Sequence, residues 1–134
     1  TVILGDNIFE SSIGEAVKNF PDAGAQIMIK NVSDPERFGV PELKGDKIVG
    51  IEEKPENPKS KYAVTGIYMY DHTVFERIRS LTPSARGEME ITDVNNSYIS
   101  EGNMRFSILE GWWTDAGTFS SLKHANELVN RDGL

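Results

Sequence analysis

The sequence predicts an α/β fold, in which a mainly parallel mixed sheet is flanked by helices and carries one hairpin excursion. Two continuous apolar runs, at residues 1–4 and 25–32, are typical of strands that are buried on both faces. Between them, residues 13–20 place apolar side chains at helical spacing, so the order is strand, helix, strand. This order favours an α/β architecture.

The first predicted strand is followed by a polar corner that contains Asp6. In open α/β sheets, ligands bind beyond the carboxyl ends of strands, so Asp6 lies where ligand-binding groups usually gather. Ser12 and Glu15 have the spacing of a capping box, which predicts the start of a helix. Pro21 is expected to end this helix.

The middle of the chain predicts a hairpin. Residues 34–37 have turn composition, and an extended stretch begins at residue 38. The tip falls at residues 44–47, and the chain returns through the apolar residues 48–51. A polar loop is expected to follow as far as residue 61.

Residues 62–70 form the longest strand candidate, because they are rich in aromatic and β-branched side chains. Gly66 interrupts this run, and such a glycine often marks close approach by a ligand or by another part of the backbone. Tyr62, Tyr68 and Tyr70 share one strand face, and we interpret them as packing residues.

The rest of the chain predicts a helix at residues 73–82, a helix at 91–99, a strand at 104–109 and a helix from Thr118 onward. Thr73 and Glu76 have the spacing of a second capping box. In the last helix Leu122, Ala125 and Val129 share one face, which we expect to be buried.

Composition limits the classes of protein that the chain fits. Its 134 residues, of which 38% are hydrophobic and 26% charged, suit one globular domain. The net charge of −7 disfavours nucleic-acid binding, and no apolar run or leader predicts a membrane segment. Cysteine is absent, which fits a cytoplasmic protein. Because the chain begins inside an apolar run, we expect it to be a piece of a longer protein.

A candidate metal ligand follows the two adjacent tryptophans. Trp112 and Trp113 are expected to pack, and Asp115 lies between them and the start of a helix. Mg²⁺ usually takes only one or two protein carboxylates and completes its shell with phosphate oxygens and water. On this stretch alone, Asp115 is either a magnesium ligand or only a cap for a turn.

Six ordered motifs resemble those of the sugar nucleotidyltransferases, and within them the branch that uses glucose 1-phosphate and dTTP. The motifs occupy residues 4–7, 34–40, 52–55, 63–68, 85–93 and 114–118. The resemblance implies a partial Rossmann-like nucleotide-diphospho-sugar transferase fold. It also implies that the intact protein converts dTTP and α-D-glucose 1-phosphate to dTDP-glucose and pyrophosphate.

One family feature has no counterpart in this sequence. The family opens with a glycine-rich, arginine-containing loop that holds the nucleotide, and no segment here resembles it. We therefore expect residues 1–134 to be the sugar-phosphate-binding and metal-binding portion of a single domain, without the nucleotide-binding part and inactive alone. Family members generally form homotetramers, which implies the same for the intact protein.

The resemblance assigns roles residue by residue. Asp6 and Asp115 match the aspartates that bind Mg²⁺, and Lys54 and Arg86 match the catalytic cations that contact the sugar phosphate. The residues that match substrate-binding positions, together with Lys54 and Arg86, are Phe38, Gly39, Glu53, Val64, Gly66 and Glu88.

Several alternatives stay open from the sequence. Lys54 could belong to a solvated surface group with its acidic neighbours, and Arg86 could simply pair with Glu88 or Glu90. The nucleotide could be a uridylyl, cytidylyl or adenylyl donor, since base selection lies largely in the part that is absent. The chain could also be a non-catalytic sugar-phosphate-binding module.

Overall fold

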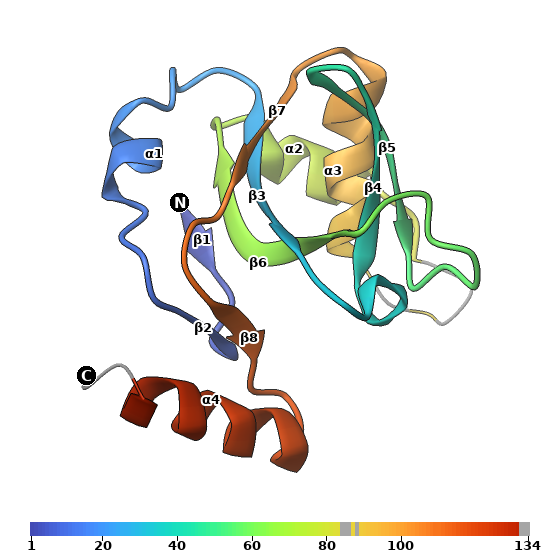
Figure 1. The fold of residues 1–134 in the computed structure, drawn as a ribbon. Coiled ribbons are helices and arrows are strands. Elements are labelled where there is room, and N and C mark those ends of the chain that lie inside the picture. Colours follow the sequence, from blue (N-terminus) through green and yellow to red (C-terminus); the bar gives the residue numbers. More distant parts are fainter. Residues whose placement is uncertain (84–86, 88, 132–134) are drawn as a thin grey trace.

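The structure is a computed structural model, and it describes residues 1–83, 87 and 89–131. Its centre is a four-stranded mixed sheet with the strand order β1-β6-β3-β7 (Figure 1). These strands are β1 Val2–Ile3, β3 Ala25–Asn31, β6 Tyr62–Tyr70 and β7 Met104–Ile108.

Three of the four strands run in the same direction. β3 pairs parallel with β7, while β6 pairs antiparallel with both β3 and β1. β1, β3 and β7 therefore share one direction and β6 opposes them, so the predicted mixed sheet is confirmed, although only the pairing of β3 with β7 is parallel among the described strands.

One face of the sheet is covered by a hairpin and two helices. The hairpin consists of β4 Gly39–Lys44 and β5 Lys47–Glu53, and the helices are α2 Val74–Ser80 and α3 Ile91–Ser100. Ile27 and Ile29 of β3 pack with Tyr68 against Ile48 and Ile51 of the hairpin, and these five side chains are buried. The predicted hairpin is confirmed, and Gly45 at its tip has a φ of 63° that glycine adopts without strain.

The opposite face is covered by the short helix α1 Gly14–Lys18 and the segments beside it. Met28 and Met69 are buried there, and Ile13, Ala16 and Phe20 pack against this cluster. Because side chains alternate along a strand, β3 contributes isoleucine to one face and methionine to the other.

A second, two-stranded ribbon brings the segments that contain Asp6 and Asp115 close together. It pairs β2 Asn7–Phe9 with β8 Trp113–Asp115 in antiparallel register, and Asn7 lies opposite Asp115. Residues 7–9 and 113–115 therefore lie side by side, although they are far apart in sequence.

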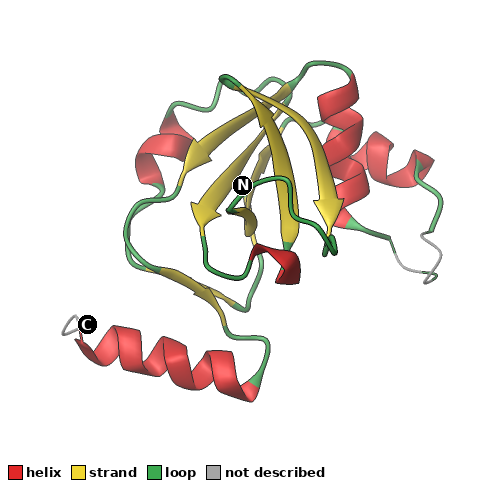
Figure 2. Cartoon of the chain, turned by 45° about the vertical axis from the view of Figure 1, so that its right-hand side comes forward, coloured by secondary structure: helices red, strands yellow, loops and turns green. Residues whose placement is uncertain are grey.

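Helix α4, Phe119–Arg131, lies beside this ribbon and apart from the sheet (Figures 1 and 2). Thr118 begins it as predicted, because its hydroxyl accepts the backbone N–H of Ser121 at 3.1 Å. Ala125 is buried, whereas Leu122 is 44% exposed, so the predicted burial of that whole face is wrong within the described residues. No helix among those residues is long and apolar enough to cross a membrane.

Three local predictions are corrected by the tertiary structure. The segment 1–4 is not a buried parallel strand, because β1 is a two-residue edge strand that pairs antiparallel with β6, and Val2 and Ile3 are 44% and 47% exposed. Neither capping box forms. The Ser12 hydroxyl accepts the N–H of Gly14, and the Thr73 hydroxyl donates to Asp71 at 2.5 Å instead of capping α2.

Candidate functional site

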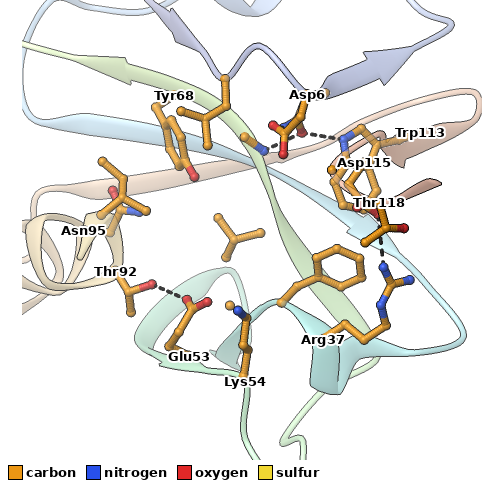
Figure 3. A pocket seen from close by; sticks show the side chains of 18 residues that line it. Asp6, Arg37, Glu53, Lys54, Tyr68, Thr92, Asn95, Trp113, Asp115 and Thr118 are labelled. Atoms are coloured by element: carbon orange, nitrogen blue, oxygen red, sulfur yellow. Dashed lines mark hydrogen bonds and ion pairs between the residues drawn. The ribbon is translucent and has the colours of Figure 1, made fainter. Parts of the chain in front are cut away.

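A cavity of about 650 Å³ lies where the sheet, the hairpin, the ribbon and the start of α3 meet (Figure 3). The segments that line it come from both ends and the middle of the chain. Its lining residues are Leu4, Asp6, Asn7, Arg37, Phe38, Gly39, Glu53, Lys54, Val64, Gly66, Tyr68, Ile91, Thr92, Asn95, Trp113, Asp115, Gly117 and Thr118.

Two carboxylates of this cavity point toward one position. A Cβ placed on Gly117 would lie 3.3 Å from Oδ2 of Asp6 and 3.7 Å from Oδ2 of Asp115. The backbone also joins the two segments, because the N–H of Ala116 donates to the carbonyl of Asp6 at 2.7 Å. The missing side chain of Gly117 leaves a space that two carboxylate oxygens face.

The other carboxylate oxygens are held by hydrogen bonds. Oδ1 of Asp6 accepts from the amide of Asn7 at 2.9 Å, and Oδ1 of Asp115 accepts from Arg37 at 3.4 Å. Oδ2 of Asp115, which faces the Gly117 position, also accepts a hydrogen bond from the hydroxyl of Ser121 at 3.2 Å. Oδ1 of each carboxylate is thus held by a neighbour, and Oδ2 of each lies near the Gly117 position.

Asn7 joins the ribbon to the sheet. Its Oδ1 accepts the N–H of Gly66 and the indole N–H of Trp113, both at 2.8 Å, while its Nδ2 donates to Asp6. A Cβ on Gly66 would lie 2.7 Å from Cγ of Asn7, which real Cβ atoms do not tolerate. Close approach at Gly66 is confirmed, but it is made by the amide side chain of Asn7 and not by the ligand or backbone that we expected.

The end of the hairpin places a cation and a carboxylate side by side. Lys54 has a φ of 46°, which is uncommon for a residue other than glycine, and its N–H donates to the carbonyl of Phe38 at 2.9 Å. The hydroxyl of Thr92 donates to Glu53 at 2.7 Å and fixes that carboxylate against α3. Backbone strain of this kind costs about 1–3 kcal/mol and often accompanies function.

Arg37 is a second cation on the cavity wall. Its guanidinium pairs with Asp34 at 2.8 Å and with Asp115 at 3.4 Å, and it lies 5.1 Å from the ring centre of Phe38. The hydrogen bond to Asp34 is the largest cause of its raised pKa, so Arg37 stays charged. Phe38 in turn meets Trp113 edge to face at 5.2 Å.

Tyr68 lines the cavity, so our interpretation of it as a packing residue alone is incomplete. It stacks on Tyr70 at 5.8 Å between ring centres, and it is 3% exposed. Burial, with smaller effects of Glu53 and Asp6, raises its pKa to about 12. The phenol is therefore neutral at physiological pH and able to donate a hydrogen bond.

The structure brings most of the predicted site residues together. Asp6, Phe38, Gly39, Glu53, Lys54, Val64, Gly66 and Asp115 all line the one cavity. Lys54 therefore faces this cavity as well as its acidic neighbours. Arg86 and Glu88 lie outside the described residues.

Sequence reasoning missed several lining residues, among them Arg37, Tyr68, Thr92 and Asn95. Thr92 and Asn95 are three residues apart on α3, and this spacing on an otherwise apolar helix face was the available signal. Among the described residues, no cluster of three or more acidic or histidine side chains could hold a metal alone. A cation bound here would take two protein carboxylates and complete its shell from a ligand, which suits Mg²⁺.

The fold and the cavity together define an α/β protein with a polar binding site at the edge of a mixed sheet. The chain belongs to the nucleotidyl transferase family, whose sequence model matches residues 1–132.

Curated relatives match this chain along nearly its whole length. A glucose-1-phosphate thymidylyltransferase of Mycolicibacterium smegmatis is 45% identical over 98% of this chain and 49% of its own length. The enzyme of the same name from Neisseria meningitidis is 44% identical over 96% of this chain and 46% of its own. The chain thus spans about half the length of these relatives.

Solved structures show the same fold. A crystal structure from Bacillus anthracis, assigned as a glucose-1-phosphate thymidylyltransferase in complex with sucrose, is 55% identical, with a TM-score of 0.88 over 94% of this chain and 52% of that one. A UDP-glucose pyrophosphorylase complexed with UDP-glucose shares the fold at 20% identity, with a TM-score of 0.81 over 97% of this chain and 55% of that one.

Proposed function

We propose that this chain is the sugar-phosphate-binding and metal-binding part of a glucose-1-phosphate thymidylyltransferase that depends on Mg²⁺. The full protein would join dTTP and α-D-glucose 1-phosphate into dTDP-glucose and release pyrophosphate. The observation that carries this proposal is the convergence of Asp6 and Asp115 on one position, in the cavity that also contains Lys54 and Glu53.

The chemistry needs no protein base. A phosphate oxygen of glucose 1-phosphate attacks the α-phosphorus of dTTP, a new P–O bond forms, and the bond to the β-phosphate oxygen breaks. The nucleophile is already an anion, so positioning and charge neutralisation supply most of the rate. Mg²⁺ held by Asp6 and Asp115 would lower the repulsion between the two phosphorylated reactants.

The side chains of this chain divide the remaining work. Lys54 offers its ammonium to the sugar phosphate, and its strained backbone is fixed by the hydrogen bond to Phe38. Glu53, which Thr92 orients, accepts hydrogen bonds from sugar hydroxyls. Arg37 supplies a second positive charge beside Asp115.

The decisive experiment measures turnover by the full product of the gene, with glucose 1-phosphate and each of dTTP, UTP, CTP and ATP. We expect dTTP to be used best, and Lys54→Met to lower kcat/KM by roughly a hundredfold because one charge-stabilising contact is lost. Lys47→Met, an exposed lysine at the start of β5, is the matched control. Preference for another triphosphate would reassign the base, and near-normal turnover of Lys54→Met would contradict its role.

Two further features belong to the same proposal. We expect the full protein to form a homo-oligomer, which light scattering would measure, and to act in the cytoplasm without nucleic-acid or membrane partners. Binding of glucose 1-phosphate by a full gene product that turns over no triphosphate would instead favour a non-catalytic sugar-phosphate module.

A further inference from the structure

A buried amide on α3 faces the cavity with an unused donor group. Asn95 is 1% exposed, and its side chain lies on the cavity wall between Tyr68 and Thr92 (Figure 3). Its Oδ1 accepts a hydrogen bond from the hydroxyl of Tyr70 at 2.7 Å. In the part of the chain that the structure describes, no hydrogen bond uses Nδ2, and no fully enclosed side-chain nitrogen lacks a partner. The Nδ2 group is therefore not fully enclosed, and the residue that carries it lines the cavity.

The orientation of this amide is fixed from behind. Tyr70 stacks between Tyr68 and Tyr98, with 5.8 Å between ring centres on each side. Burial raises the pKa of Tyr70, so its hydroxyl stays protonated and donates to the amide oxygen. Since Oδ1 of Asn95 accepts the hydrogen bond from Tyr70, Nδ2 is the polar atom of this side chain that is left to bind a ligand in the cavity.

The same face of α3 also carries Thr92, whose hydroxyl orients the carboxylate of Glu53. Thr92 lies three residues before Asn95 and donates to Glu53. This end of the cavity therefore offers a carboxylate that accepts hydrogen bonds and an amide that donates one. A sugar hydroxyl both donates and accepts, so it matches this pair of groups.

We propose that Nδ2 of Asn95 donates a hydrogen bond to a hydroxyl oxygen of the sugar 1-phosphate, and that Tyr70 is the positioning residue that fixes this amide. The inference rests on the proposed function, because it assigns a specificity contact within the same cavity. A site built to bind a hydroxyl discriminates strongly against an analogue that lacks it.

The test combines protein variants with sugar analogues. The full gene product and its Asn95→Ala variant are assayed with glucose 1-phosphate and with the four analogues that lack the hydroxyl at carbon 2, 3, 4 or 6. For one analogue, we expect the unmodified protein to lose roughly tenfold in kcat/KM and Asn95→Ala to lose less than about twofold. The other three analogues should cause equal losses in both proteins.

A second variant guards against a folding defect. Asn95→Asp keeps the oxygen that Tyr70 needs but replaces the donor with a charged acceptor. We expect it to change the loss in kcat/KM caused by the same analogue and to leave the losses caused by the other three as they are in the unmodified protein. Asn126→Asp, on the exposed side of α4, adds the same charge away from the cavity and serves as its control.

Tyr70 is tested by a change that does not touch the sugar. Tyr70→Phe should raise KM for glucose 1-phosphate roughly threefold to tenfold and leave kcat unchanged, because the amide loses the bond that orients it. Tyr62→Phe, on the same face of β6 but outside the cavity, should change neither constant.

The outcomes separate the two proposals. Turnover by the unmodified protein with equal analogue losses in Asn95→Ala would overturn the contact and leave the proposed function standing. Calorimetry with the same analogues repeats the comparison as binding affinities. A full gene product that neither turns over nor binds glucose 1-phosphate would overturn both.

Discussion

Gly117 is the residue that leaves room between the two carboxylates. A methyl group there would lie 3.3 Å from Asp6 and 3.7 Å from Asp115, in the space that a shared cation would need. We expect Gly117→Ala to weaken Mg²⁺ binding roughly tenfold, as small changes around metal ligands do, with little change in the free energy of unfolding. Calorimetric titration with Mg²⁺ measures this.

Gly50→Ala is the matched control for that measurement. A Cβ on Gly50 meets nothing within 4 Å, and the residue lies in β5, outside the lining of the cavity that contains Asp6 and Asp115. Equal Mg²⁺ affinities in Gly117→Ala and Gly50→Ala would mean that the cation does not lie between Asp6 and Asp115.

The charge of Lys54 and its strained backbone conformation can be tested by two different substitutions. Its φ of 46° lies in the left-handed region, which asparagine enters at lower cost than a straight-chain residue. Lys54→Asn and Lys54→Met both remove the ammonium, so both should lose activity. We expect the asparagine variant to be more stable by about 0.5–1 kcal/mol, as urea denaturation would measure. A less stable asparagine variant would show that the strain is relieved elsewhere.

At the scale of elements, hydrogen bonds to Asp71 connect the start of α2 with α3 and with the segment before β3. Its carboxylate accepts from the backbone of Gly24 at 2.7 Å, from Thr73, and from the hydroxyl of Tyr98 at 2.9 Å. Burial raises the pKa of Asp71, but these hydrogen bonds together outweigh it, so its pKa lies below the ordinary 3.8. Arg77 lies 3.9 Å above the ring of Tyr98 and extends this connection to Glu101.

The lowered pKa of Asp71 predicts a pH-dependent contribution to stability. A carboxyl whose pKa is lower in the folded than in the unfolded protein stabilises the fold at pH values above its unfolded pKa. This stabilisation is lost as the pH falls through the pKa of the folded state. Asp71→Asn should destabilise the chain by about 1–3 kcal/mol at pH 7, because its NH₂ would face the N–H of Gly24. The difference from the unmodified chain should shrink below pH 3.8. Denaturation at pH 7 and pH 3 measures both values, with the exposed Asp46→Asn as control.

Elements that depend on local sequence were predictable, and those that depend on distant partners were not. The hairpin around Gly45 and the helix that Thr118 begins follow from turn and cap residues close in the chain. The Thr73 capping box failed because Asp71 competes for the same hydroxyl. The segment 1–4 reads as a buried strand by its apolar side chains, but its place at the edge depends on the direction of β6.

The candidate site shows the same division. Motif resemblance pointed to the carboxylates and to Lys54, because these side chains follow strand ends at recognisable spacing. It did not point to Tyr68 or Asn95, whose exposure to the cavity depends on how β6 and α3 pack. Which helix face meets a cavity is set by tertiary contacts, and a single sequence does not carry them.

At the scale of the whole chain, residues 1–134 carry a net charge of −7, which opposes the binding of an anion. Binding of the proposed substrate, glucose 1-phosphate, would therefore depend on local positive charge. The cavity holds Lys54 and Arg37, but Arg37 is engaged with Asp34 and Asp115. Removing divalent cations with EDTA should therefore weaken glucose 1-phosphate binding to the full gene product by more than about tenfold. By reciprocity, glucose 1-phosphate should strengthen Mg²⁺ binding by the same factor.

Salt distinguishes a bound cation from general screening of the protein's charge. At 0.5 M NaCl the field of distant carboxylates is screened within a few ångströms, whereas a cation held by Asp6 and Asp115 acts at contact distance. We expect NaCl not to restore the affinity for glucose 1-phosphate that EDTA removes. We also expect Asp115→Asn to bring the factor by which Mg²⁺ strengthens glucose 1-phosphate binding close to one. Recovery of affinity in NaCl without Mg²⁺ would mean that overall charge, and not this pair of carboxylates, governs binding.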